Sequence, residues 1–317
     1  SYTRHALGDY FETVMARPRE AKALRPAPGG YLGLLEQDPD EETIGLIGPF
    51  LESARLMGRR TAEMHCTLAG ATSDPDFAPE PFSGFHRRSL YQSMRNLAGQ
   101  VLRTLKRVSR RLPDELRDTV DCLLDRKDTI MGVFRRILEV RDPGLRFRIH
   151  GDLHLGQVLF TGKDFVIIDF EGEPARPLSE RRKKGSPIRD VAGMLRSFHY
   201  AAHAALFRQQ AVGMTNGMAP DQAADLFEYW NAWVASGFLA AYLEPARQGG
   251  FLPAAEELTA LLETYVLEKA VYELGYELNH RPDWVSIPMK GIRRLIEPEP
   301  ERGSGGRTHS TKRETSP

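Results

Sequence analysis

The chain has few cysteines, no excess of charge of either sign and no long hydrophobic run. Its two cysteines, Cys66 and Cys122, exclude a disulfide-rich scaffold. Free thiols in a reducing cytosol are the simplest interpretation, and one disulfide is the alternative. The 43 basic and 43 acidic residues produce no overall field that would recruit nucleic acid or an anionic membrane. The most apolar stretch, residues 233–243, is too short to span a bilayer.

The first residues lack the charged region and apolar core of a secretory signal, and we expect a cytoplasmic protein. A length of 317 residues suffices to bury a substantial core in one or two domains. Hydrophobic periodicity and breaker residues predict a flexible connection over residues 21–42 and long helices at about residues 7–18, 44–69, 90–108, 113–140, 186–207, 220–244 and 253–279. The sequence therefore predicts an α+β fold that is predominantly α.

The most informative stretch runs from residue 149 to residue 173. Asp152 and Gln157 lie five residues apart, and Asp169 follows after twelve more. Two short apolar runs flank the turn-like residues 161–164, which predicts a hairpin that returns Asp169 to the loop carrying Asp152. Phosphoryl transfer needs a carboxylate that receives the acceptor proton and oxygen ligands for magnesium on the nucleotide phosphates. The spacing indicates a phosphotransferase with Asp152 as catalytic base and Asp169 and Gln157 as Mg²⁺ ligands beside ATP.

Two other interpretations of this stretch stay open. Aspartates in loops between strands are often turn formers or helix caps. His150, Asp152 and His154 alternate, so on an extended segment they point the same way and would suit a borderline metal such as zinc. No other His-x-His or His-Glu-x-x-His pair completes such a site. We expect His150 and His154 to brace the catalytic loop through hydrogen bonds of their rings.

The segments His150-Gly-Asp-Leu-His-Leu-Gly-Gln157 and Ile168-Asp-Phe-Glu-Gly-Glu-Pro174 resemble the aminoglycoside phosphotransferase-type kinase superfamily and, within it, the maltokinases. The superfamily usually has Asn where Gln157 stands, so Gln157 and residues 170–174 narrow the resemblance to maltokinases. Further similar segments lie at residues 51–65, 176–182, 186–197, 268–279 and 281–284. The resemblance extends from about residue 5 to about residue 295.

The resemblance implies a protein-kinase-like carboxy-terminal lobe with a small catalytic β-hairpin. It also implies an ATP-dependent enzyme that phosphorylates maltose at the anomeric hydroxyl to give maltose 1-phosphate. Maltokinases are often fused to trehalose synthase and feed glycogen and other α-glucan synthesis. Maltose, ATP and a trehalose synthase are therefore the implied partners.

The amino-terminal region of this family has no counterpart in the sequence. No Gly-rich loop between strands, followed by a strand Lys, precedes Asp152, and Gly29-Gly30 and residues 45–48 are weak as phosphate-binding loops. We expect residues 1–297 to form the carboxy-terminal lobe, with the catalytic loop and metal hairpin at 146–174, and residues 298–317 to form a disordered tail. The chain is expected to be inactive, or poorly active, without a nucleotide lobe.

Further candidates follow the metal-binding Asp. Either Glu171 or Glu173 could assist the metal or bind sugar hydroxyls, and either could instead pair with the basic run 181–184. Arg176 is a candidate phosphate ligand, whereas the basic run can equally be a solvated loop face. Asp190 opens a helix, where a carboxylate complements the helix dipole. The resemblance implies that Asp190 also holds the backbone of the catalytic loop.

Tyrosines in the last long helix are the best indication of the acceptor. Tyr272 and Tyr276 offer the flat faces and hydroxyls that a sugar needs, and the resemblance favours them as acceptor-binding residues, joined by Asn279 and Trp284. Packing against the core is the alternative for tyrosines at helical spacing. His65 is expected to be a hydrogen-bonded core histidine.

Three functions remain open on the sequence. The first is a maltose kinase lobe. The second is a kinase of the same fold for another acceptor, such as an aminoglycoside or choline, although a pocket for a cationic acceptor should be densely acidic. The third is an inactive module that binds sugar or a partner without chemistry.

Overall fold

The computed structural model describes residues 2–17, 23–211 and 219–297. The tail predicted at residues 298–317 lies outside these ranges. Within them, helices dominate and strands are short and few, which confirms the predominantly α, α+β class. The α-helices are α1 Tyr2–Ala16, α3 Gly30–Gly33, α4 Glu41–Ile47, α5 Phe50–Ala69, α6 Gly84–Val108, α7 Arg117–Asp125, α8 Lys127–Arg135, α9 Leu178–Arg181, α10 Ile188–Ala211, α11 Pro220–Gln248, α12 Ala255–His280 and α13 Ser286–Ile296.

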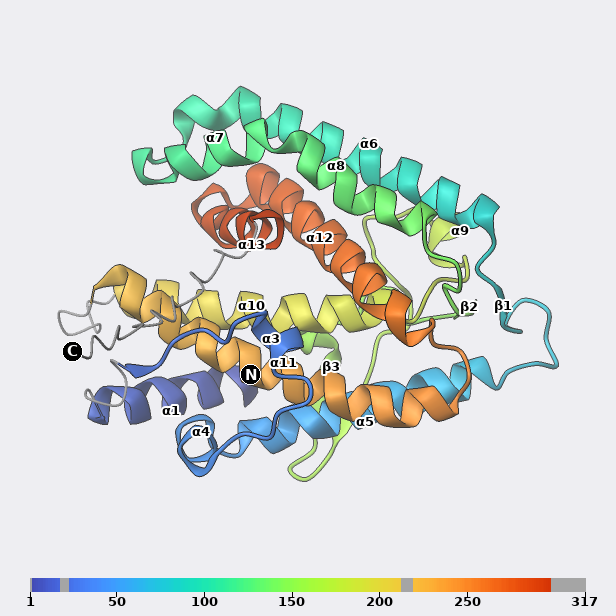
Figure 1. Ribbon diagram of the computed structural model, residues 1–317, viewed down its shortest axis with the longest axis horizontal. Coiled ribbons are helices and arrows are strands. Elements are labelled where there is room, and N and C mark those ends of the chain that lie inside the picture. Colours follow the sequence, from blue (N-terminus) through green and yellow to red (C-terminus); the bar gives the residue numbers. More distant parts are fainter. Residues whose placement is uncertain (1, 18–22, 212–218, 298–317) are drawn as a thin grey trace, which may run out of the picture.

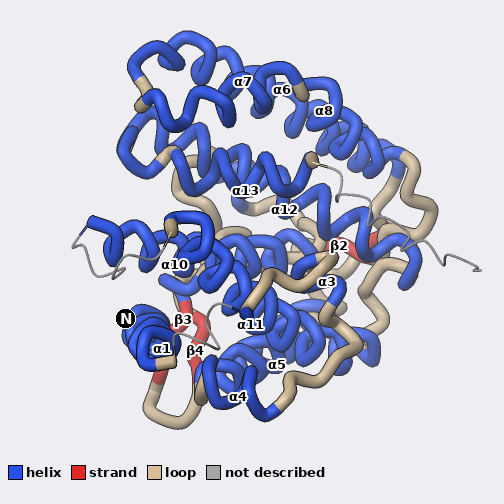
Figure 2. The backbone as a smooth tube through the Cα atoms, turned by 60° about the vertical axis from the view of Figure 1, so that its left-hand side comes forward, coloured by secondary structure: helices blue, strands red, loops and turns tan. Residues whose placement is uncertain are grey.

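The helices are stacked in three groups (Figure 1). The helices α6, α7 and α8 form one outer group, α12, α13 and α10 lie in the middle, and α11, α5, α4 and α1 form the other outer group. Figure 2 shows the same order from a second direction. The helix α11 packs along α5, and α12 contacts both α10 and α6. The middle group therefore joins the two outer groups.

Two glycines permit the closest of these helix contacts. A Cβ at Gly58 on α5 would lie 2.2 Å from the carbonyl oxygen of Phe238 on α11. A Cβ at Gly275 on α12 would lie 2.8 Å from Val101 Cγ2 on α6. Since these separations are shorter than van der Waals contact, a larger residue at either position would force the helices apart.

The strands pair in two small antiparallel sheets. The pair of β1 (Glu80–Pro81) and β2 (Leu145–Arg146) was not predicted. The hairpin of β3 (Val158–Phe160) and β4 (Phe165–Ile167) is as predicted. Short 3₁₀ turns complete the described structure at η1 Ser109–Arg111, η2 Asp114–Leu116, η3 Arg136–Leu138, η4 Leu155–Gln157 and η5 Pro282–Trp284.

Two of the predicted helices are interrupted. The helix expected over residues 44–69 is divided between α4 and α5, because Gly48 has a φ of 69° and Pro49 has no N–H to continue the ladder. The helix expected over residues 113–140 is divided into α7 and α8 at Arg126, with 3₁₀ turns at its two ends. The connection expected over residues 21–42 also contains α3 and the first turn of α4.

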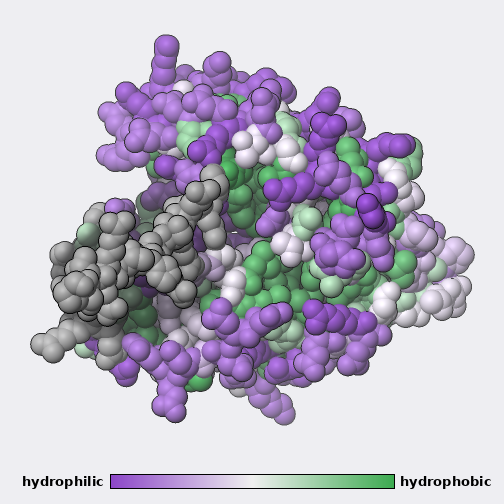
Figure 3. Space-filling model, viewed as in Figure 1, coloured by the Kyte–Doolittle hydropathy of each residue, from purple (hydrophilic) through white to green (hydrophobic). Residues whose placement is uncertain are grey.

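The core is rich in aromatic side chains contributed by several helices. Trp230, Phe198 and Phe238 are fully buried, and Phe50 stacks on Trp230 with ring centroids 5.2 Å apart. On the face shown in Figure 3, hydrophobic residues are visible mainly in the middle, between hydrophilic upper and lower edges. Cys66 and Cys122 are free, as the simplest interpretation predicted. In the described ranges, no helix combines the length and the apolar character required to cross a membrane.

Candidate active site

The loop that carries Asp152 is held by a buried carboxylate in the first turn of α10. Asp190 is 1% exposed and accepts hydrogen bonds from the backbone N–H groups of His150 (2.8 Å) and Gly151 (2.9 Å). Its Oδ2 also lies 3.1 Å from His65 Nε2 on α5. Burial opposes the charge of Asp190, but the hydrogen bonds outweigh it and hold the pKa of Asp190 below its usual value. Asp190 thus fixes the loop to two helices.

The histidines on either side of Asp152 bond within this region. His150 Nε2 lies 2.8 Å from the carbonyl oxygen of Ile168 at the end of the hairpin, and His150 Nδ1 accepts from the Asp152 N–H at 3.3 Å. His154 Nδ1 accepts from the Gly156 N–H at 2.9 Å and so caps η4. Because both nitrogens of His150 are engaged, the zinc-type arrangement of His150, Asp152 and His154 does not form.

Gly193 on α10 lets the catalytic loop lie directly on the helix. A Cβ at this position would lie 2.4 Å from the carbonyl oxygen of Leu153. We predict that Gly193→Ala lowers the free energy of unfolding by about 1–3 kcal/mol, because the added methyl overpacks against backbone. Urea denaturation measures this. The matched control is Gly132→Ala on α8, where nothing lies within 4 Å, and it should be neutral or slightly stabilising. Equal stability of the two variants would contradict the contact.

Asp169 follows β4 in an unusual backbone conformation. Its φ of 67° makes it the one non-glycine residue with positive φ in the described part of the chain. Such strain persists where the surroundings enforce it, and it is frequent at functional sites. Asp169 Oδ2 accepts a 2.9 Å hydrogen bond from Gln157 Nε2, so the hairpin brings together the two residues that the sequence paired.

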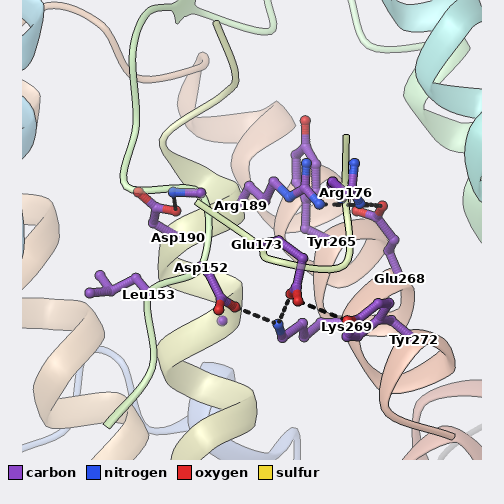
Figure 4. A pocket seen from close by; sticks show the side chains of 12 residues that line it. Asp152, Leu153, Glu173, Arg176, Arg189, Asp190, Tyr265, Glu268, Lys269 and Tyr272 are labelled. Atoms are coloured by element: carbon purple, nitrogen blue, oxygen red, sulfur yellow. Dashed lines mark hydrogen bonds and ion pairs between the residues drawn. The ribbon is translucent and has the colours of Figure 1, made fainter. Parts of the chain in front are cut away.

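Asp152 faces a lysine from α12. Its Oδ1 accepts from Lys269 Nζ at 3.2 Å, and Lys269 also lies 3.4 Å from Glu173 Oε2. The hydroxyl of Tyr272, one turn further along α12, donates to Glu173 Oε1 at 2.8 Å. Figure 4 shows Lys269 between the two carboxylates, with Tyr272 beside Glu173. Residues distant in sequence thus form one hydrogen-bonded group around the candidate base.

This environment shifts the pKa values of Asp152 and Glu173 in opposite directions. Burial raises the pKa of Asp152 to about 6, with Glu173 acting in the same direction and Lys269 in the opposite one. Burial also opposes the charge of Glu173, but Lys269 and Tyr272 outweigh it and lower the pKa of Glu173. Asp152 therefore takes up the proton first as the pH falls. A carboxyl group with a pKa near neutrality is suited to general-base work.

Two guanidinium groups lie on the other side of the same hollow. Arg176 Nη2 is 3.5 Å from Glu268 Oε1, and Arg189 Nη2 is 4.0 Å from the same oxygen. Figure 4 places both arginines near Tyr265, across the hollow from Asp152. Arg176 and Glu173 were site candidates on the sequence, whereas Arg189 and Lys269 were not. The only signal for Lys269 was a charged Glu-Lys pair between apolar positions of a long helix.

Four other sequence candidates lie outside this group. Glu171 is exposed and pairs with Arg181 at 3.5 Å, as one of its expected roles required. Tyr276 is 43% exposed and stacks on His280. Asn279 donates to a carbonyl of its own helix, and Trp284 stacks parallel to Tyr200 at 6.2 Å. The structure thus brings Tyr272 to the hollow beside Asp152, but not Tyr276, Asn279 or Trp284.

A small hollow lined by Asp152 adjoins a second, larger one. The one lined by Asp152, Lys269 and Tyr272 has a volume of about 20 Å³, room for about one water molecule. The other, about 450 Å³, lies between α6 and the segment that leads to α10. The two share Gly151, Glu173, Arg176, Arg189 and Tyr265. Of these two hollows, the second has room for more than a water molecule, and its lining includes Phe82, Phe85 and His86, which the sequence did not single out.

Comparison with known proteins gives consistent results. The family described as "Phosphotransferase enzyme family" (APH) matches residues 51–221, more than half of the chain. Glucosamine kinase of Mycolicibacterium smegmatis is 32% identical over 148 residues, 47% of this chain and 34% of the relative. Glucosamine kinase of Streptacidiphilus jiangxiensis is 26% identical over 253 residues, 78% of this chain and 50% of the relative.

A solved glucosamine kinase, in complex with glucosamine, ADP and inorganic phosphate, superposes with a TM-score of 0.63 at 22% identity. The match covers 78% of this chain and 52% of that chain, and it shows the fold. The chain thus spans half or less of the length of the two curated relatives it matches, and about half of the solved one.

Proposed function

Because this chain belongs to the phosphotransferase enzyme family, we propose that it carries the catalytic and acceptor-binding lobe of an ATP-dependent sugar kinase. The observation that supports this most is the position of Asp152, a carboxyl group with a pKa of about 6 on a loop fixed by Asp190 and directed toward a hollow. In the reaction, a sugar oxygen forms a bond to the γ-phosphorus, the bond to the bridging oxygen of ADP breaks, and Asp152 receives the hydroxyl proton.

Asp169 and Gln157 fit a magnesium ion. Both side chains carry oxygen atoms of the kind that Mg²⁺ prefers. Gln157 Nε2 lies 2.9 Å from Asp169 Oδ2. Rotating the Gln157 amide by half a turn would place its oxygen where its nitrogen now lies. When bound, the ion would neutralise charge on the ATP phosphates. Arg176 and Arg189 are proposed to bind phosphate oxygens of the transferred group or product, because their planar guanidinium groups line both hollows.

Lys269 is proposed to orient Asp152. Its ammonium group lies between Asp152 and Glu173 and counteracts the effect of burial on the pKa of Asp152. Tyr272 fixes Glu173 from the other side. Lys269 Nζ contacts Oδ1 of Asp152, so the other carboxylate oxygen, Oδ2, does not take part in this contact. That oxygen is the one placed to receive a proton from the acceptor.

We propose maltose as the acceptor, phosphorylated at the anomeric hydroxyl. The residues around the small hollow include four carboxylates, Asp152, Glu173, Asp190 and Glu268, and three cations, Lys269, Arg176 and Arg189. Lys269 already pairs with Asp152 and Glu173. A neutral sugar needs no further charge partner there, whereas an ammonium group would compete with Lys269 for the same carboxylates. The larger hollow, about 450 Å³, is in the range of small-molecule sites and offers aromatic faces to a disaccharide.

Glucosamine is the second candidate acceptor, and the curated relatives favour it because both are glucosamine kinases. For an amino sugar to bind beside Asp152, the Lys269 side chain would have to move away, so that the ammonium group of the sugar pairs with Glu173 instead. The distinction therefore depends on Lys269. Its removal should improve glucosamine binding if the amine takes its place.

We also propose that adenine and the distal phosphates are covered by a nucleotide lobe outside these residues. The support is that the matches cover only 34% and 50% of the two curated relatives, and that the described sheets have two strands each. Isothermal titration of the chain with maltose and with ATP, done separately, tests this. Sugar binding with weak or undetectable ATP binding is expected, and nucleotide binding as tight as in a relative would contradict it.

The proposed function is tested by ³¹P NMR of mixtures that contain ATP, Mg²⁺, a sugar and the protein. The protein is assayed both as this chain and as a longer form that includes it. Maltose is expected to yield a sugar 1-phosphate, and glucose and glucosamine serve as competing acceptors. Product from glucosamine alone would replace the maltose proposal with the second candidate. ADP formation that no sugar stimulates would contradict a sugar kinase.

A further inference from the structure

A second cluster of ligand-type side chains lies away from the catalytic loop. His199 and His203 are one turn apart on α10, and Glu228 faces them from α11. Glu228 Oε1 lies 2.8 Å from His203 Nε2 and 3.4 Å from His199 Nε2. All three ligand atoms fall within 4.8 Å of one another, and the two histidines are buried. The nearest of them is nine residues from Asp190, or roughly 13 Å along the helix.

We propose that His199, His203 and Glu228 bind one divalent transition-metal ion of borderline softness, such as Zn²⁺. Imidazole nitrogen and carboxylate oxygen are the ligands such ions take, at about 2.0–2.2 Å. In a tetrahedral site with bonds of this length, the ligand atoms are roughly 3.4 Å apart. The observed separations of 2.8 and 3.4 Å require only a small adjustment to reach this geometry.

A buried polar atom on α11 without a hydrogen-bond partner also supports the proposed metal site. Asn231, one turn after Glu228 on α11, is 8% exposed, and its Oδ1 has no hydrogen-bond partner. A buried acceptor without a protein partner is costly, and a water molecule or an ion commonly satisfies such a group. Asn231, His199 and Glu228 line one hollow of about 790 Å³. Asn231 Oδ1, or a water that it holds, can therefore supply the fourth ligand.

Two arginines limit the affinity of this site. Arg294 pairs with Glu228 Oε2 and leaves Oε1 for the metal. Arg196 Nη1 lies 3.2 Å from His199 Nδ1. Because a guanidinium group only donates, Nδ1 is the acceptor there and the proton is on Nε2. Metal binding at Nε2 moves this proton to Nδ1 and displaces Nη1, while Arg196 keeps its bonds to Glu273. We expect weaker binding than in a closed zinc site.

The position of the site indicates a structural role. Its ligands come from α10 and α11, the two helices on either side of residues 212–218. A metal bond would tie these helices together directly, in addition to the buried apolar side chains between them. Since Asp190 lies in the first turn of α10, the ion would stabilise the helix that supports the catalytic loop without contacting the substrate.

The experiment is a titration of metal-free chain with Zn²⁺ by calorimetry, with Co²⁺ absorption spectra as a second readout of the ligand set. One equivalent is expected for the wild type and for His5→Gln, whose ring is on the surface of α1. His203→Gln is expected to lower affinity at least tenfold and to abolish the Co²⁺ bands of the site. Circular dichroism verifies that each variant is folded, and Glu228→Gln replaces His203→Gln if the latter is not.

Two outcomes overturn the proposal. One is the absence of stoichiometric Zn²⁺ binding to the wild type. The other is binding that persists in His203→Gln but disappears in His154→Gln, because the ion would then belong to the catalytic loop.

Discussion

Replacement of Asp152 by asparagine is expected to reduce sugar phosphorylation by about 10²–10⁴-fold, the usual contribution of a general base. Asparagine has nearly the same shape and still accepts a hydrogen bond from Lys269, so the fold should be unchanged. What is lost is the ability of Asp152 to take the hydroxyl proton. Initial rates with saturating ATP and sugar measure this. The control is Asp121→Asn, on the exposed side of α7, which should retain full activity.

The pH profile makes the Asp152 prediction more specific. Because its pKa is raised to about 6, the wild-type rate should fall as the pH decreases through about 6, where Asp152 becomes protonated. The charged and titratable groups that face it are Lys269, Glu173 and His154. The residual rate of Asp152→Asn should lack this acidic limb. The range from pH 5 to pH 7 extends about one unit to either side of this pKa. A wild-type rate that does not change over this range would show that Asp152 is not the base.

Replacement of Asp190 by alanine is expected to destabilise the fold by about 1–3 kcal/mol, the cost of leaving a buried hydrogen-bonding group without its partner. The change leaves the N–H groups of His150 and Gly151 without an acceptor and removes the partner of His65 Nε2, while His65 Nδ1 keeps its contact with Tyr242. Urea denaturation followed by circular dichroism gives the free energy of unfolding.

Asp190→Asn is the matched comparison for this prediction. Asparagine keeps one acceptor oxygen for the loop, so its cost should be clearly smaller than that of alanine. If alanine and asparagine cost the same, or if alanine costs less than 1 kcal/mol, the hydrogen bonds of Asp190 do not hold the catalytic loop in the way inferred here.

The parts of the site that depend on local sequence could be predicted. The loop, the hairpin and the second carboxylate lie within 25 residues, so turn composition and β-branched runs suffice to bring Gln157 and Asp169 together. The contact between Lys269 and Asp152 spans 117 positions. It depends on how α12 packs against α10, and nothing local in the sequence specifies that.

The tyrosines of α12 show why a helical face is an incomplete guide to function. Tyr265 is 3% exposed and Tyr276 is 43% exposed, although the two tyrosines are at helical spacing on α12. Their surroundings differ because α12 contacts several different helices along its length. Of the two tyrosines chosen for the acceptor, the one nearer the middle of the helix, Tyr272, is therefore the one that meets Glu173.

Helix breaks were missed for a related reason. Gly48 and Pro49 were visible in the sequence, but apolar periodicity continues across them, so a single helix was predicted over residues 44–69. In the structure the positive φ of Gly48 redirects the chain between α4 and α5. The breaker residues deserved more weight than the periodicity.

We propose that Asp152 and Asp169 face one phosphoryl-transfer site. The decisive measurement is the anomalous difference map of a crystal grown with Mn²⁺ and a non-hydrolysable ATP analogue, with a nucleotide lobe present. We expect a Mn²⁺ peak in contact with Asp169 and Gln157, and a terminal phosphate between that peak and Asp152. A peak away from Asp169, or a phosphate that Asp152 does not face, would rule out a shared site.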